Sequence, residues 1–308
     1  MVTMELPRKA VHMVDHEAGS LVEVALIADQ CTCAVRGAEY GTLDEVLRES
    51  PHRAQLLALW ARLLVTVTPE ELAVEMVDEL WRRDITEWLA AIEQLLAYAD
   101  LRRIGSLDRF VAEVLSWRWA LQMPFARIML SAVTKSLPDG ILPSHYLVAR
   151  GMVIEATDRV GCPGLTGALT GLIAHGWRDT QFPAVRHAAD LARHVDRELP
   201  GARSRRQAIA ALALVVGQGR DGGPVTVTLR RDGRVLTGDD DPAREAGAEK
   251  ATVVAARVVQ FAASGALDEI ETELSDQVPG EYELVSVLLA LALAAAAHVR
   301  DEVRPGLG

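Results

Sequence analysis

Lysine is almost missing from this chain of 308 residues, and cysteines and aromatic residues are scarce. Only three of the 32 basic residues are lysines, three residues are cysteines, and Phe, Trp and Tyr together make up 5%. So few aromatic residues disfavour an all-β domain, and three cysteines cannot form a disulfide scaffold. The formal net charge is −11, whereas wrapping nucleic acid requires a basic surface. We therefore expect neither a disulfide-rich fold nor a nucleic-acid partner.

The sequence contains no segment with the pattern of a signal peptide or a membrane span. Residues 1–9 include Glu5 and Pro7 instead of an apolar stretch. The alanine-rich uncharged run 284–299 has 16 residues, whereas a spanning helix needs about 20. We interpret this run as a fully buried core helix. The three cysteines are expected to be free thiols, which predicts a cytoplasmic protein with no membrane contact.

Alanine and leucine are the residues that the chain has in excess. They number 46 and 40, more than a quarter of the sequence, and 29 of the basic residues are arginines. The abundance of alanine, glycine, valine and arginine is typical of a high-GC genome, and we expect a bacterial source. The alanine and leucine excess predicts a mainly α protein, either a multi-helix bundle or a short α-helical repeat stack.

Helical periodicity is clearest in the first third of the chain. Apolar residues recur at helical spacing between Leu56 and Val67, which predicts one amphipathic helix opened by Ser50 and Pro51. Residues 68–100 predict either two helices in tandem or one long helix with a bend. A second capping pattern, Ser204 to Gln207, predicts another helix that begins at Ser204.

One stretch has the pattern of β structure. Residues 224–231 and 234–237 are β-branched and alternating, and the Asp232-Gly233 pair between them is typical of a tight hairpin turn. We therefore predict one β-hairpin insertion at about 224–237, within the segment 219–248. An isolated hairpin is marginally stable, so it should pack on a helix or on another chain.

A Gly-x-Leu motif recurs at the start of several predicted helices. It is found at 41–46, 105–110 and 265–270, with a weaker copy at 167–172. The spacing predicts two helical halves, an N-terminal half at 1–138 and a C-terminal half at 139–308 that carries the insertion. Convergent helix capping explains the same motif, and both interpretations stay open.

Three arginines are the candidate binding residues with the strongest physical reason. Arg203, Arg205 and Arg206 lie beside a predicted helix start, where the helix dipole is positive. Three cations in this place are unfavourable unless an anion or an acidic partner compensates them. The sequence therefore predicts a binding surface there, although an exposed and hydrated loop is the simpler alternative.

A second candidate surface is formed by Trp117, Arg118 and Trp119. The two tryptophans lie on nearly opposite faces of a predicted helix. If both are buried, the helix is central to the core; if one is exposed, it is an anchor for a partner, because Trp and Arg are frequent in interface hot spots.

The histidines and acidic residues do not predict a metal site or a cofactor. His12 and His16 have the spacing of paired metal ligands without the acids of a zinc protease. His187, Asp190 and His194 predict a charged, solvent-facing helix stripe. Phosphate-binding loops, dinucleotide fingerprints, nucleophile elbows and CxxC pairs are all missing. No residue can be nominated as catalytic.

These observations favour a cytoplasmic helical scaffold or protein-binding module, with a protein partner or a second copy of the chain bound at its surface. The alternative is an enzyme or a small-ligand-binding protein with an apolar pocket between helices.

Overall fold

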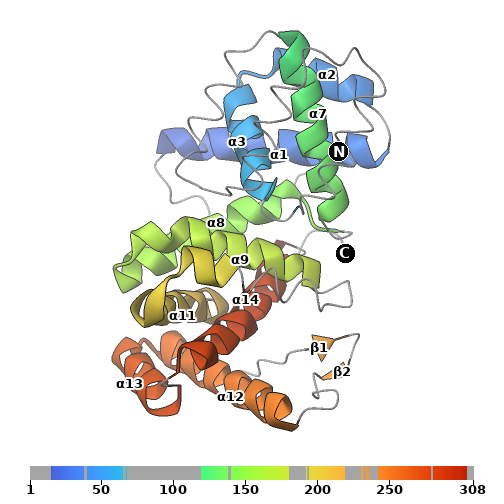
Figure 1. Ribbon diagram of the computed structural model, residues 1–308. Helices are drawn as coiled ribbons and strands as arrows, with labels where there is room; N and C mark the ends of the chain where they lie inside the picture. The colour runs from blue at the N-terminus through green and yellow to red at the C-terminus, as the bar shows by residue number, and fades with distance from the viewer. Residues whose placement is uncertain are drawn as a thin grey trace. The chain divides into compact units, whose positions relative to one another are not determined.

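The computed structural model describes residues 15–37, 40–64, 67, 119–137, 140–179, 192, 194–218, 230–231, 234–235, 242–278 and 280–303 (Figure 1). These residues are mainly helical, as the composition predicts. The predicted helices at 68–100, the Gly105 motif and the residues His12, His187 and Asp190 lie outside the described residues. The chain divides into two compact units, Met1–Leu147 and Val148–Gly308. The expected boundary between 138 and 139 stays a prediction.

The first unit contains four described helices and the start of a fifth. They are α1 (Asp15–Arg36), α2 (Tyr40–Glu49), α3 (Arg53–Leu63), α7 (Trp119–Ser136) and the first residues of α8 (Pro143–Val160). Helix α1 packs against α2, α3 and α7, and α3 also packs against α7. The stripe predicted between Leu56 and Val67 is buried, with Trp60 completely inaccessible to solvent, so this helix is confirmed. Its predicted opening by Ser50 and Pro51 is wrong, because the helix begins at Arg53 with His52 as its N-cap. The Ser50 hydroxyl instead accepts a hydrogen bond from the His52 N–H (3.1 Å) in the preceding turn.

A buried carboxylate on α1 anchors the beginning of α8. One oxygen of Asp29 accepts a hydrogen bond from the Ser144 N–H at 2.9 Å, and the side chain is 7% exposed. The second oxygen is buried and has no hydrogen-bond partner among the described residues. Burial raises the pKa of Asp29 to about 6, although its contact with Ser144 and the charge of Arg36 act in the opposite direction. His145 Nδ1 accepts from the Leu142 N–H (3.2 Å) at the same helix start.

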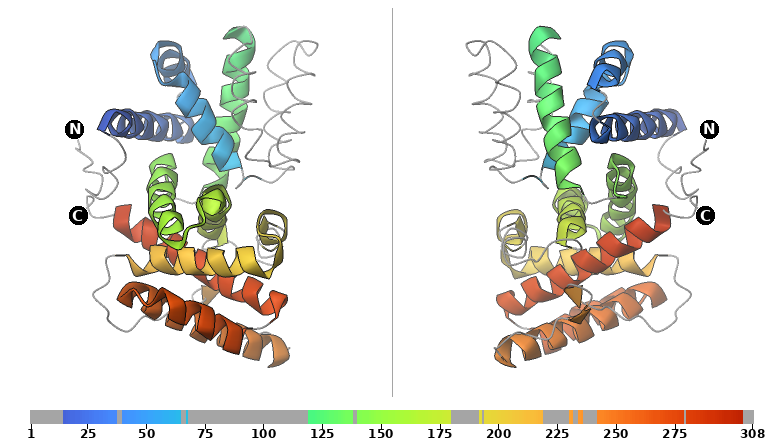
Figure 2. Two further views of the ribbon diagram at one scale, coloured as in Figure 1. Left: turned by 90° about the vertical axis from the view of Figure 1, so that its left-hand side faces the viewer. Right: turned by 90° about the vertical axis from the view of Figure 1, so that its right-hand side faces the viewer.

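The second unit is built around one long apolar helix. Its elements are the rest of α8, a 3₁₀ turn η5 (Pro163–Leu165), α9 (Thr166–Asp179), a short helix at 194–198, α11 (Gly201–Gly217), β1 (Arg230–Arg231), β2 (Arg234–Val235), α12 (Pro242–Ser264), α13 (Leu267–Gln277) and α14 (Glu281–Val303). Helix α14 packs against α9, α11 and α12, and runs obliquely across the unit (Figures 1 and 2). Helix α12 also packs against α11 and α13.

Helix α14 contains the uncharged run that predicts a core helix. Leu284, Leu288 and Leu291 are completely buried, while Val285 and Leu289 are half-buried, so the expectation of full burial is wrong for part of the run. Among the described helices, α14 contains one segment, Glu281–Glu302, that is long and apolar enough to cross a membrane by length and composition, and 56% of its apolar window is buried. A core helix of a soluble protein meets the same criteria.

Small side chains bring α9 and α14 close together. A Cβ added to Gly176 would lie 3.0 Å from the Ala296 Cβ and 3.1 Å from the Ala292 carbonyl oxygen. At the next residue, Trp177 Nε1 donates a hydrogen bond to the Ala296 carbonyl oxygen (3.0 Å). The alanine excess therefore has a structural use, because only glycine and alanine permit this distance between the two backbones.

The structure describes only two residues of each strand of the predicted hairpin. Strands β1 and β2 pair antiparallel, with Arg231 opposite Arg234 and Arg230 opposite Val235. The other residues of 224–237 lie outside the described part of the chain, so the insertion stays a prediction. Helix α12 begins at Pro242, so the last residues of the expected segment 219–248 are helical.

The copies of the Gly-x-Leu motif differ in their backbone. Gly265 has a φ of +78° and separates α12 from α13, with the Ala266 N–H donating to the Phe261 carbonyl oxygen (2.9 Å). This is the usual glycine-terminated helix end. Gly41 and Gly167 instead lie inside the first turns of α2 and α9. The repeat stays a prediction.

Candidate functional site

The three candidate arginines all lie within the first two turns of one helix. Helix α11 begins at Gly201, three residues before the predicted start, so the expected capping role of Ser204 is wrong. Its hydroxyl instead donates to the carbonyl oxygens of Pro200 (2.6 Å) and Gly201 (3.0 Å). Successive helical residues point about 100° apart, so the arginines have three different environments.

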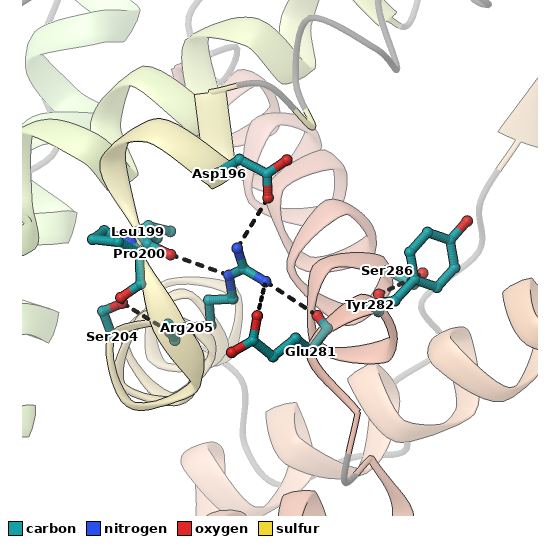
Figure 3. A network of polar contacts seen from close by, with 9 residues as sticks. Asp196, Leu199, Pro200, Ser204, Arg205, Glu281, Tyr282 and Ser286 are labelled. Atoms are coloured by element: carbon teal, nitrogen blue, oxygen red, sulfur yellow. Dashed lines mark hydrogen bonds and ion pairs between the residues drawn. The ribbon is translucent and has the colours of Figure 1, made fainter.

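Arg205 points into the protein, and its guanidinium is enclosed by polar groups from the preceding residues 196–199 and from the start of α14 (Figure 3). Nε donates to the Leu199 carbonyl oxygen (3.1 Å) and Nη2 to Asp196 Oδ1 (2.9 Å). Nη1 donates to the Glu281 carbonyl oxygen (3.4 Å) and lies 3.6 Å from Glu281 Oε2. The side chain is 8% exposed. Arg205 is therefore compensated within the chain and connects the 194–198 helix, α11 and α14.

Arg206 is held against α13. Its Nη1 donates to Glu271 Oε1 (2.6 Å) and to Ser275 Oγ (3.0 Å), and its side chain is 24% exposed. Glu271 and Ser275 are separated by one turn of α13, so they contact the same guanidinium. Nε of Arg206 is buried and has no hydrogen-bond partner among the described residues.

Arg203 points to solvent and makes no hydrogen bond or ion pair with a described residue. It borders a surface depression of about 530 Å³ between α11 and α13, which we call the α11–α13 depression. Its lining consists of Ala202, Arg203, Arg206, Gln207 and Glu271. Of the candidate arginines, the structure thus brings Arg203 and Arg206 together at one surface, while Arg205 contacts the 194–199 segment and the start of α14.

The second candidate surface cannot be described in the same way. Trp117 and Arg118 lie outside the described residues, and Trp119 is the first residue of α7. Whether this segment is core or an anchor for a partner stays a prediction.

Two histidines of the second unit, His175 and His194, are buried, and for His194 this differs from the prediction. His194 is 3% exposed, so its predicted place on a solvent-facing stripe is wrong. Its Nε2 lies 3.1 Å from the Ala168 carbonyl oxygen, and its ring meets that of His175 edge to face at 5.1 Å between centroids. Both contacts come from α9, which the local sequence around His194 does not reveal. Among the residues that the structure describes, no three His, Cys, Asp or Glu side chains form a metal-binding group.

The cysteines are free thiols, as expected. Cys33 is exposed, whereas Cys31 and Cys162 are buried. Burial raises the pKa of Cys31 to about 12 and also raises the pKa of Cys162, where Asp158 adds a smaller effect of the same sign. The two buried thiols are therefore poor nucleophiles.

Several residues at or near the site were not predicted. Gln207 follows Arg203 by one helical turn, and Glu271 with Ser275 forms an i, i+4 pair on α13. Tyr282, at the start of α14, is 80% exposed. The α11–α13 contact joins segments about 65 residues apart, and a single sequence carries no signal for that pairing.

Comparisons with protein-family models, curated proteins and solved structures found no match to this chain.

Proposed function

We propose that this chain is a helical scaffold or protein-binding module that engages its partner at the α11–α13 depression. The observation that supports the proposal most directly is the pair Arg203 and Arg206, which line this depression from one face of α11. Arginine is among the residues that contribute most to interface energy, particularly when a rigid element holds it in place. Arg205 supplies this rigidity, because its contacts fix the first turns of α11.

An exposed tyrosine adds to the features expected of an interaction surface. Tyr282 directly follows Glu281, which contacts Arg205 through both its carbonyl oxygen and its carboxylate (Figure 3). A tyrosine that is 80% exposed buries a large area on binding at small cost in conformational entropy. Tyr282 and the arginines therefore extend from elements that the same network holds together.

The finer features of the proposal concern the hairpin and the compartment. We place a second contact at the hairpin of 224–237, because the edge of a short β pair can accept another strand. The partner is another protein or a second copy of this chain. Free thiols are the normal state of cysteine in a reducing compartment, which supports a cytoplasmic location. The alternative, an enzyme with an apolar pocket between helices, stays a prediction. The α11–α13 depression is not such a pocket, because four of its five lining residues are polar.

Site-specific photo-crosslinking in cells tests the proposal. A photoreactive amino acid in place of Ala202, which lines the depression and leaves both arginines intact, should form an adduct of one defined mass. The yield of this adduct should fall when Arg206→Gln is added. The same group at Glu155, which is exposed on α8, is the matched control position. Equal adducts at both positions, or none at 202, would contradict the proposal. Removing residues 222–241 tests the hairpin contact: an unchanged yield at 202 would show that the hairpin is dispensable.

A further inference from the structure

The α11–α13 depression holds two guanidinium groups that differ in mobility. Arg206 is fixed at Nη1 by Glu271 and Ser275, at 2.6 and 3.0 Å. Arg203, one helical turn earlier, is exposed and makes no hydrogen bond or ion pair with a described residue. The guanidinium of Arg206 therefore offers a bound ligand a constant position, whereas the Arg203 side chain can change its rotamer to contact that ligand. Gln207 adds a carboxamide to the same lining.

The charge balance of the lining favours an anion. Two guanidiniums face the single carboxylate of Glu271, which Arg206 already neutralises. The charge left uncompensated is that of Arg203, so a cation is repelled from the depression and an oxyanion is attracted. The rest of the chain opposes this attraction, because the formal net charge is −11. Anion binding at this place therefore depends on the local arginines.

We infer that the depression binds the carboxylate groups of an acidic segment in a partner protein, with Arg203 and Arg206 as the binding residues. This inference rests on the proposed function, since it names the chemistry of the partner. A guanidinium matches a carboxylate with two parallel N–H donors, which fixes the orientation of the bound segment as well as attracting it. A duplex nucleic acid fits poorly, because its backbone would approach a strongly acidic protein with only two arginines to receive it.

The binding of fluorescent hexaglutamate to the full chain, followed by anisotropy, tests the inference. The wild-type protein should bind hexaglutamate, and the affinity should fall as salt is added. Arg203→Gln and Arg206→Gln should each weaken binding by about threefold to tenfold. Arg257→Gln is the matched control, because Arg257 on α12 is exposed, pairs with Glu273 and is not part of the lining. It should leave the affinity unchanged.

Glu271→Gln separates a binding role of Arg206 from a merely structural one. The substitution removes the carboxylate that competes for Arg206, so hexaglutamate should bind about twofold to fivefold more tightly. If Arg206 only connected α11 to α13, the same substitution would leave binding unchanged or weaken it. A decrease in affinity would overturn the inference.

The remaining outcomes separate this inference from the proposed function. No binding of hexaglutamate, or equal binding by Arg203→Gln and wild type, overturns the acidic partner. A persistent crosslink from position 202 would then leave the protein-binding function standing. Displacement of the peptide by inorganic phosphate at equal ionic strength supports an oxyanion site, whereas phosphate binding without peptide binding overturns a carboxylate-bearing segment as the occupant. Peptide binding without any crosslink from position 202 would support the anion site and contradict the proposed function.

Discussion

Replacing the buried Asp29 by asparagine should change how the stability of the protein depends on pH. The pKa of this carboxyl rises from an ordinary value of 3.8 to about 6 in the folded chain, mainly because of burial. A difference of about two pH units corresponds to about 3 kcal/mol. The folded protein binds the proton more tightly than the unfolded chain, so this stabilisation is fully present below about pH 4 and is lost as the pH rises through 6.

Asp29→Asn isolates this contribution. The amide oxygen can still accept the hydrogen bond from the Ser144 N–H, but the side chain cannot ionise. The free energy of unfolding of the variant minus that of the wild type should therefore increase by about 3 kcal/mol between pH 4 and pH 7. All other titrations cancel in this difference.

Urea unfolding followed by circular dichroism at a series of pH values measures this difference. Gly151→Ala, which changes no ionisable group and meets nothing within 4 Å, is the control and should give a difference that is independent of pH. A flat difference for Asp29→Asn as well would refute the reasoning. A carbon-13 titration of the carboxyl groups in the folded protein gives a second reading, in which one resonance with a midpoint near pH 6 should vanish in the variant.

Three further predictions follow from packing and burial. Gly176→Ala should lower the free energy of unfolding by about 1–2 kcal/mol, because the added Cβ would lie 3.0 Å from the Ala296 Cβ of α14. Gly151→Ala, in α8, should raise the free energy of unfolding by about 0.5–1 kcal/mol, because its Cβ would meet nothing within 4 Å. Urea unfolding distinguishes the two signs. Arg205→Ala should cost about 2 kcal/mol in the same assay, since it removes a buried guanidinium with four polar contacts, and a cost near zero would contradict its connecting role. A thiol reagent should modify Cys33 rapidly in the folded protein and Cys31 only on unfolding, which mass spectrometry of the labelled peptides can follow.

Local patterns in the sequence predicted local structure well. The helix around Trp60 was recognisable because its buried face repeats every three to four residues, and that period belongs to the helix itself. The start of α11 was misplaced because the pattern from Ser204 to Gln207 resembles a capping box. The backbone instead enters the helix at Gly201, which has a φ of +81°, and Pro200 provides no side-chain cap.

The sequence shows that three arginines are clustered but not which environment each of them has. The cluster of Arg203, Arg205 and Arg206 is visible in the sequence, but which of them points inward depends on Asp196 and Glu281. Glu281 lies 76 residues away from Arg205, and the burial of His194 likewise depends on a helix that precedes it by 26 residues. Such contacts arise only when the helices pack, and no periodicity within one segment encodes them.

The close approach of α9 and α14 has a consequence for the entropy of folding. Glycine and alanine have no side-chain rotamers to lose, so ordering Gly176 against Ala292 and Ala296 costs backbone entropy alone. The attraction across this contact comes from backbone atoms brought near to each other, with no large side chain filling the space between them. The contact also cannot adapt to a larger residue, because an alanine methyl group has no rotamer that would move it away from a new neighbouring atom. The contact therefore holds the two helices in one relative position and tolerates change only when both helices change together.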